Sequence, residues 1–242
     1  MNTRRMTAML VLTTLGIVLA GCFNPFDPRV EGRGISTPPP TPNSPSGVLR
    51  LFEWAYNNRD FSQYRTVFTD DYRFVFGATD TAGNRYRNQP YTRADELASA
   101  QNLFGAASTI TLALDKSFVV FPDPRPGMNP TYHKNILTQV QLNIVTQDGG
   151  QTNVEGKANF FLVRGDSAAI PADLGVQPDS NRWYIDRWED QTLAGALALA
   201  RLDASGRSIV PAAARPAGGA TAARSVSDVL YVTWGELKRL YP

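Results

Sequence analysis

The chain has 242 residues, with 24 Lys and Arg against 22 Asp and Glu, one His and one Cys. This near balance of charge excludes the strongly basic surface that nucleic-acid binding requires. A single cysteine excludes an intramolecular disulfide, so the hydrophobic core must stabilise the fold, and the length is sufficient for one sizeable domain.

Residues 1–21 have the pattern of a secretory signal peptide. Arg4 and Arg5 form its positive start, and the mostly apolar residues 6–19 that follow are too few to cross a bilayer, which takes about 20 residues. The run ends in L-A-G-C, which resembles the lipobox of bacterial lipoproteins at all four positions and places the cysteine at Cys22. The resemblance implies cleavage before Cys22 and attachment of fatty acyl chains, such as palmitate, to it. The alternative is an ordinary signal peptide with a chance cysteine.

Acylation of Cys22 would anchor the protein to a membrane and would remove the only thiol of the chain. Two or three acyl chains anchor a protein stably, so the membrane is the expected partner through its lipid, and the thiol is lost as a nucleophile. The residue after the cysteine is Phe23. In bacteria with two membranes, an Asp at this position tends to retain lipoproteins in the inner membrane. We therefore expect the protein to be located in the cell envelope, at the outer membrane and facing the periplasm. Loss of Arg4 and Arg5 with the signal leaves 22 basic and 22 acidic residues.

A proline-rich tether is predicted to follow, over residues 22–43. Its segment T-P-P-P-T-P, at residues 37–42, favours the extended polyproline II conformation and acts as a semi-rigid spacer. Because the tether offers few apolar side chains to bury, the folded domain is predicted to begin after it, over residues 44–191.

The domain is predicted to open with two helices. Ser44 suits the N-cap and Pro45 the first helical position, and apolar residues then recur at helical spacing. Asp60 can cap a second, shorter helix that carries apolar residues up to Phe68 and ends at residues 70–71.

A strand and a third helix come next. Residues 72–76 alternate between aromatic and other side chains, which predicts a strand. Thr92 is a suitable cap for a helix over residues 93–104, and Asp95 and Glu96 lie in its first turn, where the helix dipole favours acidic side chains.

From Ser108 onward the apolar period changes to two. Alternation predicts strands at residues 109–114, 136–144 and 153–162, and a last strand at 182–188, with a proline-rich loop over residues 122–130. Clean alternation means one buried face and one wet face, so the sheet is predicted to be antiparallel.

Two stretches resemble a known superfamily. Residues 48–71 read V-L-R-L-F-E-W-A-Y-N-N-R-D-F-S-Q-Y-R-T-V-F-T-D-D before Tyr72-Arg73-Phe74, and the last strand reads W-x-I-x-x-W over residues 183–188. With the order of elements, they resemble the nuclear transport factor 2-like (NTF2-like) superfamily, which includes SnoaL-like and ketosteroid isomerase-like proteins. The resemblance implies an α+β, cystatin-like fold, in which a curved antiparallel sheet packs on N-terminal helices to make a cone. In that superfamily the cone holds a substrate or ligand, forms a dimer surface, or is filled by side chains.

The C-terminal part divides into an Ala/Gly/Pro-rich linker at residues 192–225 and a docking segment at 226–242. Residues 226–232 suit a short extended stretch, and T-x-x-E starting at Thr233 is a capping box for a short helix. A lone helix of this length is unstable in water, so we expect it to pack on the domain; the alternative is a frayed tail. The apolar residues expected to pack are Trp234, Leu237, Leu240 and Tyr241.

No residue is assigned as catalytic, cofactor-binding or metal-binding, and no cofactor is expected. The single histidine, His133, follows the proline-rich loop without partners at ligand spacing, so we interpret it as a solvated loop residue. Neither a G-x-S-x-G nor a P-loop motif occurs.

One enzymatic possibility remains, because ketosteroid isomerase-like proteins transfer protons with a carboxylate and a tyrosine inside the cone. The spacing of such residues in this chain matches no motif of that superfamily. Those on suitable elements are Tyr56, Tyr72, Asp115, Glu155 and Asp186.

Eight aromatic residues either line a ligand cavity or form the core, and we expect the core, since aromatic side chains contribute much of the buried area of a domain. They are Phe52, Trp54, Phe74, Phe76, Phe118, Phe160, Trp183 and Trp188.

Two classes of function therefore stay open. The favoured one is a non-catalytic envelope lipoprotein that binds a protein partner or a small apolar ligand, with a second copy of the chain as a further candidate partner. The alternative is a SnoaL-like or ketosteroid isomerase-like acid–base enzyme that acts on a small apolar substrate. An open cone with a buried carboxylate of raised pKa beside a tyrosine or tryptophan donor would favour the enzyme. An apolar cavity or an exposed apolar patch without that pair would favour the binding module, and a filled cone would indicate a structural module.

Overall fold

The computed structural model describes residues 37–242 except 79, 87–89, 166–180 and 193–228. The predicted signal peptide, the predicted acylation site Cys22 and most of the predicted tether lie outside the described residues. So do nearly all of the predicted linker and the first three residues of the docking segment. The residues described from Pro39 onward belong to one compact unit.

Local capping interactions begin helices α2 (Pro45–Asn58), α3 (Phe61–Tyr64) and α4 (Arg93–Ala106) at the predicted residues. Helix α2 follows Ser44, whose hydroxyl accepts a hydrogen bond from the Gly47 backbone N–H at 2.9 Å. Helix α3 follows Asp60, and helix α4 follows Thr92, which forms a capping box with Asp95. Each cap satisfies backbone N–H groups that the first turn leaves unpaired.

The second helix is shorter than predicted. It ends at Tyr64, and strand β1 (Phe68–Val75) already includes Asp70 and Asp71, which were predicted to end the helix. These two aspartates are both exposed, at the point where the register of β1 against its neighbour shifts. Such an irregularity breaks the period of two, so the strand predicted at residues 72–76 is confirmed over residues 72–75, and only the first four residues of β1 were missed.

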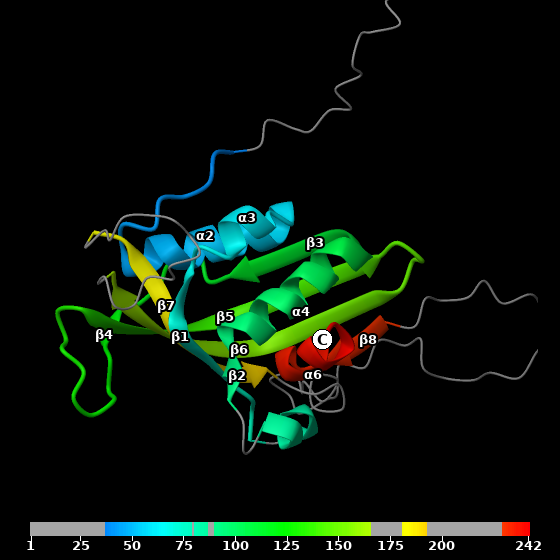
Figure 1. Ribbon diagram of the computed structural model, residues 1–242. Helices are drawn as coiled ribbons and strands as arrows, with labels where there is room; N and C mark the ends of the chain where they lie inside the picture. The colour runs from blue at the N-terminus through cyan, green and yellow to red at the C-terminus, as the bar shows by residue number, and fades with distance from the viewer. Residues whose placement is uncertain (1–36, 79, 87–89, 166–180, 193–228) are drawn as a thin grey trace, which may run out of the picture. The chain divides into compact units, whose positions relative to one another are not determined.

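A mixed sheet forms the second layer. The strand order is β2-β1-β7-β6-β5-β3, with β4 paired to β5 and β8 paired to β6. Helices α2 and α4 lie over one face of this sheet, and the short helix α6 lies next to α4 (Figure 1). The remaining elements are β2 (Tyr91–Thr92), β3 (Ala107–Leu114), β4 (Phe121–Pro122), β5 (His133–Thr146), β6 (Gln151–Arg164), β7 (Trp183–Thr192), β8 (Val229–Val232), α6 (Trp234–Leu240) and the 3-10 helix η1 (Thr81–Tyr86).

The α+β class is confirmed, and so is the antiparallel pairing of the four long strands β3, β5, β6 and β7. The prediction of a wholly antiparallel sheet was wrong at two pairings, because β1 runs parallel to β7 and β8 runs parallel to β6. Alternation shows which face of a strand is buried, but it does not show the direction of the neighbouring strand.

Two residues predicted to lie in a loop belong to strands. His133 is the first residue of β5, partly buried, with its Nδ1 3.2 Å from the carbonyl oxygen of Asn129. Pro122 pairs with Lys134 in the short edge strand β4, a position where its missing N–H is tolerated. The proline-rich loop is therefore shorter than the sequence suggested.

The core fills the space between the helices and the sheet, which we call the cone interior. The inward side chains of β5 and β6 are almost completely buried, as their alternation predicted. The aromatic residues form this core, as expected. Phe52, Phe74, Phe160, Trp183 and Trp188 are buried, and Trp54, Phe76 and Phe118 are partly buried against them.

The C-terminal segment packs against the same core. Trp234 and Leu237 are buried, and Tyr241 is partly buried against them, as expected. Leu240 is 43% exposed, so the expectation that it packs on the domain was wrong. Arg239 and Leu240, at the end of α6, both remain in solvent, whereas Trp234, Leu237 and Lys238 face the core. Within the described part of the chain, no helix is long and apolar enough to cross a membrane.

Candidate functional site

A buried carboxylate lies in the cone interior. Glu96, on the first turn of α4, accepts hydrogen bonds from the hydroxyl of Tyr64 at 2.7 Å and from that of Tyr72 at 3.0 Å. The Nζ of Lys238, on α6, lies 2.7 Å from Oε1 and 2.5 Å from Oε2 of the same carboxylate. The exposed fraction of the side chain is 1% for Glu96 and 3% for Lys238. The polar site is thus an ion pair with both carboxylate oxygens engaged.

Aromatic rings surround the ammonium group of Lys238. Its Nζ lies 4.5 Å from the ring centroid of Phe74, 4.5 Å from that of Trp188 and 5.3 Å from that of Tyr91. A cation within about 6 Å of a ring centroid is attracted by the negative ring face. The site therefore offers a cation both a carboxylate and a set of aromatic surfaces.

Hydrogen bonds to the domain hold the N-terminus of α6. The backbone N–H of Gly235 donates to Asp190 Oδ2 at 3.0 Å, and that of Trp234 donates to the Thr192 hydroxyl at 2.8 Å. The hydroxyl of Thr233, the cap residue, donates to Asp80 Oδ2 at 2.6 Å. Carboxylates at this end complement the helix dipole and satisfy the first N–H groups of the helix.

An aromatic contact completes the attachment of α6. The Trp234 indole packs edge-on against Trp188, with ring centroids 4.4 Å apart, and lies 5.7 Å from the ring of Tyr56. Strand β8 adds backbone pairing with β6 just before the helix. The C-terminal segment therefore closes the cone interior with side chains of its own.

Burial sets the direction of the pKa shifts at this site. It raises the pKa of Tyr64 and Tyr72, and the negative charge of Glu96 raises both further, so the two hydroxyls keep their protons and act as donors. Burial lowers the pKa of Lys238, although Glu96 opposes that shift. Burial also raises the pKa of Asp190 at the helix end.

While α6 is in place, the Glu96 carboxylate is engaged by the Lys238 ammonium and by two tyrosine hydroxyls. A general base must reach the proton that it removes, within hydrogen-bond distance in a plausible substrate pose. Glu96 instead faces Lys238, Tyr64 and Tyr72 and is closed to solvent. A substrate can reach Glu96 only if α6 leaves the cone interior.

Two of the five residues considered for acid–base chemistry lie in the cone interior. Tyr72 donates to Glu96, and the ring of Tyr56 packs against Tyr64 and Trp234. Burial raises the pKa of Tyr56, with Glu96 adding to the effect.

The three carboxylates proposed with these tyrosines lie elsewhere. Asp115 accepts hydrogen bonds from the Thr138 hydroxyl and the Gln139 backbone N–H, at the end of β3. Asp186 forms an ion pair with Arg125 at 2.5 Å, and Glu155 lies on the outer face of β6. None of the three is brought next to Tyr56 or Tyr72.

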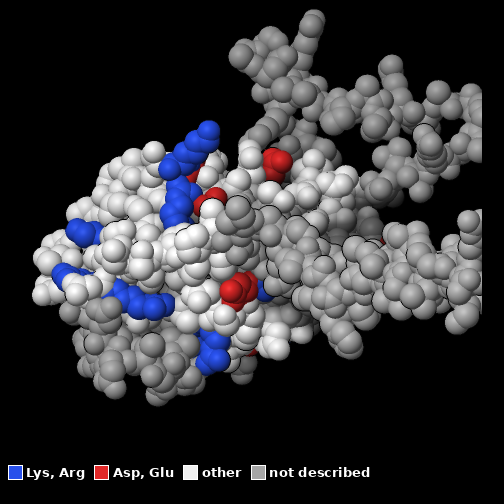
Figure 2. Space-filling view, turned by 90° about the horizontal axis from the view of Figure 1, so that it is seen from above, with Lys and Arg blue, Asp and Glu red and all other residues white. Residues whose placement is uncertain are grey.

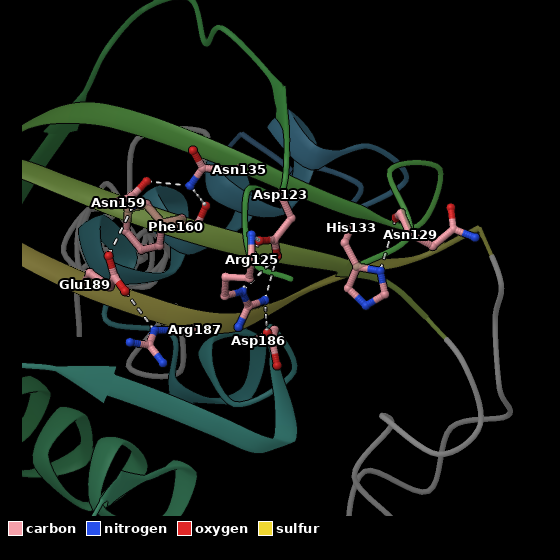
Figure 3. A network of polar contacts seen from close by, with 10 residues as sticks. All are labelled: Asp123, Arg125, Asn129, His133, Asn135, Asn159, Phe160, Asp186, Arg187 and Glu189. Carbon is pink, nitrogen blue, oxygen red and sulfur yellow. Dashed lines mark hydrogen bonds and ion pairs between the residues drawn. The ribbon is translucent and has the colours of Figure 1, made fainter. Parts of the chain in front are cut away.

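A polar network covers the outer side of β5–β7, away from the helices. Arg125 lies between Asp123 and Asp186 (Figure 3) and stacks over the Phe161 ring at 4.5 Å. Nearby, Asn159 accepts a hydrogen bond from Asn135 at 2.5 Å and donates to Glu189, which pairs with Arg187. These groups satisfy one another, so the network is a fixed polar surface.

The outer face also has a shallow hollow and exposed apolar side chains. The hollow, of about 280 Å³, is lined largely by polar residues of β3, β5 and β6, among them Thr111, Gln141 and Glu155. Phe121 is 52% exposed and lies opposite Asn135 in the β4–β5 ladder. Leu137, which is 44% exposed, follows Asn135 by two residues on β5. Residues two apart in a strand point to the same side, so the two apolar side chains share this face.

Glu96 and Lys238 were missed as site residues, because Glu96 was interpreted only as a first-turn acid. A signal was present in the helical spacing. Glu96 precedes the buried Ala100 by four residues and the buried Leu103 by seven, so all three share one helix face. Lys238 likewise follows the buried Trp234 by four residues.

Among the described residues, no group of three His, Cys, Asp or Glu side chains is placed to hold a metal ion. Figure 2 shows one face of the molecule, on which charged side chains of both signs are spread among uncharged ones.

No protein-family model and no curated protein matches this sequence. Solved structures that resemble it include a conserved protein from Planctomyces limnophilus, 14% identical, which matches over 60% of this chain and 91% of its own with a TM-score of 0.43. An NTF2-like superfamily protein from Salmonella enterica serovar Typhimurium is 13% identical over 59% of this chain and 83% of its own, with a TM-score of 0.38. A ketosteroid isomerase-like protein from Erwinia carotovora atroseptica is 11% identical over 60% and 89%, with a TM-score of 0.37. Likenesses this distant say nothing about activity, and the fold class rests on the elements described above.

Proposed function

We propose that this chain is a lipoprotein of the bacterial cell envelope, anchored through acyl chains on Cys22, that works as a non-catalytic binding module. Its expected place is the outer membrane facing the periplasm. The observation that supports a binding role is the Glu96–Lys238 ion pair, which engages the buried Glu96 carboxylate of the cone interior with a group of the same chain. Exposed apolar side chains on the outer face, such as Phe121 and Leu137, suit contact with a protein partner.

The alternative is an acid–base enzyme of the SnoaL-like or ketosteroid isomerase-like kind that acts on a small apolar substrate. The presence of Tyr64 and Tyr72 beside Glu96 favours it, because a carboxylate and hydroxyl donors are the groups that such chemistry uses. It requires α6 to leave the cone in every turnover. Enzymes typically turn over at about 1–10³ s⁻¹, so opening must be at least that fast.

Thiol labelling of the mature, acylated protein separates the two functions. Leu237→Cys places a thiol on the buried side of α6, where a reagent reaches it only after the helix leaves. Leu240→Cys, on the exposed side of the same helix, is the matched control, and Leu49→Cys on α2 reports global unfolding. At high reagent concentration, the labelling rate of the Leu237→Cys variant equals the rate of opening.

We expect the Leu240→Cys variant to react at once and the Leu237→Cys variant to react more slowly than about 1 s⁻¹. Since the smaller side chain weakens packing of α6, a slow rate in this variant is a strict upper bound for the native chain. The unsubstituted protein should not react, because acylation blocks the thiol of Cys22. Opening slower than about 1 s⁻¹ contradicts the enzymatic alternative, whereas faster opening removes this support for the non-catalytic function. Labelling of the unsubstituted protein would contradict acylation.

A further inference from the structure

The groups that surround the Lys238 ammonium all precede α6 in the chain. Glu96 comes from α4, and the aromatic rings of Phe74, Tyr91 and Trp188 come from β1, β2 and β7. Only the cation itself belongs to α6. The domain therefore builds a complete receptor for a cation, and the C-terminal helix supplies the occupant.

This receptor depends on a positive charge. A carboxylate without a partner in a low-dielectric interior carries a large desolvation penalty, which a hydrogen-bonded cation offsets. Tyr64 and Tyr72 donate to Glu96 but carry no charge, so the positive charge comes from Lys238.

The shape of the site selects the kind of cation. The Lys238 Nζ donates to both oxygens of Glu96, and the rings of Phe74 and Trp188 approach it to 4.5 Å. An ammonium with three N–H donors on an unbranched apolar chain satisfies this geometry. A planar guanidinium would need space for its five donors, and a quaternary ammonium has no N–H to donate.

We propose that the cone interior is a binding site for primary alkylammonium ligands, held by the Glu96 carboxylate against Phe74, Tyr91 and Trp188, and that Lys238 is its tethered internal occupant. The inference rests on the proposed binding function and names the ligand class. A free amine of this class competes with Lys238 for one site, so ligand binding and docking of α6 exclude each other at this position. Binding of such a ligand thereby changes the exposure of the C-terminal helix.

Chemical rescue of the full mature chain tests this proposal. Lys238→Ala removes the fragment from Cγ to Nζ, which corresponds to n-propylammonium. Titration with n-propylammonium should raise the melting temperature of this variant saturably, by about 5 °C near saturation. The same titration with 1-propanol, which has the same chain without the charge, should give no saturable shift.

Two further variants assign the effect to the site. Lys238→Met fills the same volume without charge, and the double variant E96Q/K238A keeps the space but removes the carboxylate; neither should respond to the amine. If K238A is unfolded at the assay temperature, the titration is followed as recovery of the folded state, with the same controls. Absence of a saturable response in K238A, an equal response in E96Q/K238A, or an equal response to tetramethylammonium would each overturn the proposal. These outcomes do not depend on the opening rate measured with Leu237→Cys, so failure of the ligand assignment and failure of the proposed function are distinguishable.

Discussion

Replacing Trp234 by Ala should release the C-terminal helix without unfolding the domain. The indole is fully buried and packs against Trp188 and Tyr56. Removal of a buried tryptophan costs about 3–5 kcal/mol. At about 1.4 kcal/mol per tenfold change, the equilibrium between docked and released α6 should shift by roughly two to three and a half powers of ten. Because α6 follows the domain core in the chain, most of this loss should appear as local opening rather than global unfolding.

Hydrogen exchange resolved by residue measures this effect. Amides of α6 and β8 should exchange faster in the W234A variant by the factor given above, whereas amides of β5 and β6 should keep their native protection. Leu240→Ala, on the exposed side of the same helix, should change exchange by less than a factor of about two to three. Native protection of α6 in the W234A variant would refute the role of this side chain as the main anchor. Equal loss of protection in β5 would refute local release.

Three other predictions concern the core, the helix end and the anchor. Trp183→Ala should lower the free energy of unfolding by about 3–5 kcal/mol, measured by chemical denaturation, and an unchanged value would mean that this side chain contributes no core packing. Burial raises the pKa of Asp190 above its ordinary value, so the folded state takes up its proton at higher pH than the unfolded state. The native chain should therefore gain stability relative to Asp190→Asn as the pH falls from 7 towards 4, and a pH-independent difference would contradict this. Cys22→Ala should leave an uncleaved precursor without acyl chains, and mass spectrometry that finds a mature N-terminus elsewhere would reject the lipobox.

The parts of the fold that sequence could predict are those determined by local interactions. Ser44, Thr92 and Thr233 each cap the helix that follows, because cap chemistry involves only residues within one turn. The buried faces of β5 and β6 followed from alternation for the same reason. Where the register of β1 shifts near Asp70 and Asp71, the local period is broken, and the first part of the strand was taken for the end of a helix.

The candidate site was not predictable in this way, because its two charged residues are 142 positions apart in the chain. Helical spacing places Glu96 on a buried face and Lys238 on the same side as Trp234. No local pattern shows that these two faces meet. The three carboxylates suggested instead lie on strands or at their ends, and the alternation of β6 already placed Glu155 on its outer face.

Apolar burial and the Glu96–Lys238 ion pair contribute differently to the docking of α6. Apolar burial of Trp234 and Leu237 supplies most of the attraction, but it is nearly insensitive to a small shift or rotation of the helix. The Glu96–Lys238 pair adds little net stability, since desolvation of both groups offsets most of their attraction. Any other position of the helix, however, leaves Glu96 buried without a cation and is penalised by several kcal/mol. The ion pair therefore determines the position of α6, and burial of the Trp234 indole determines how tightly the helix is held. A ligand that replaces the Lys238 ammonium removes the constraint on position before it removes the apolar contacts.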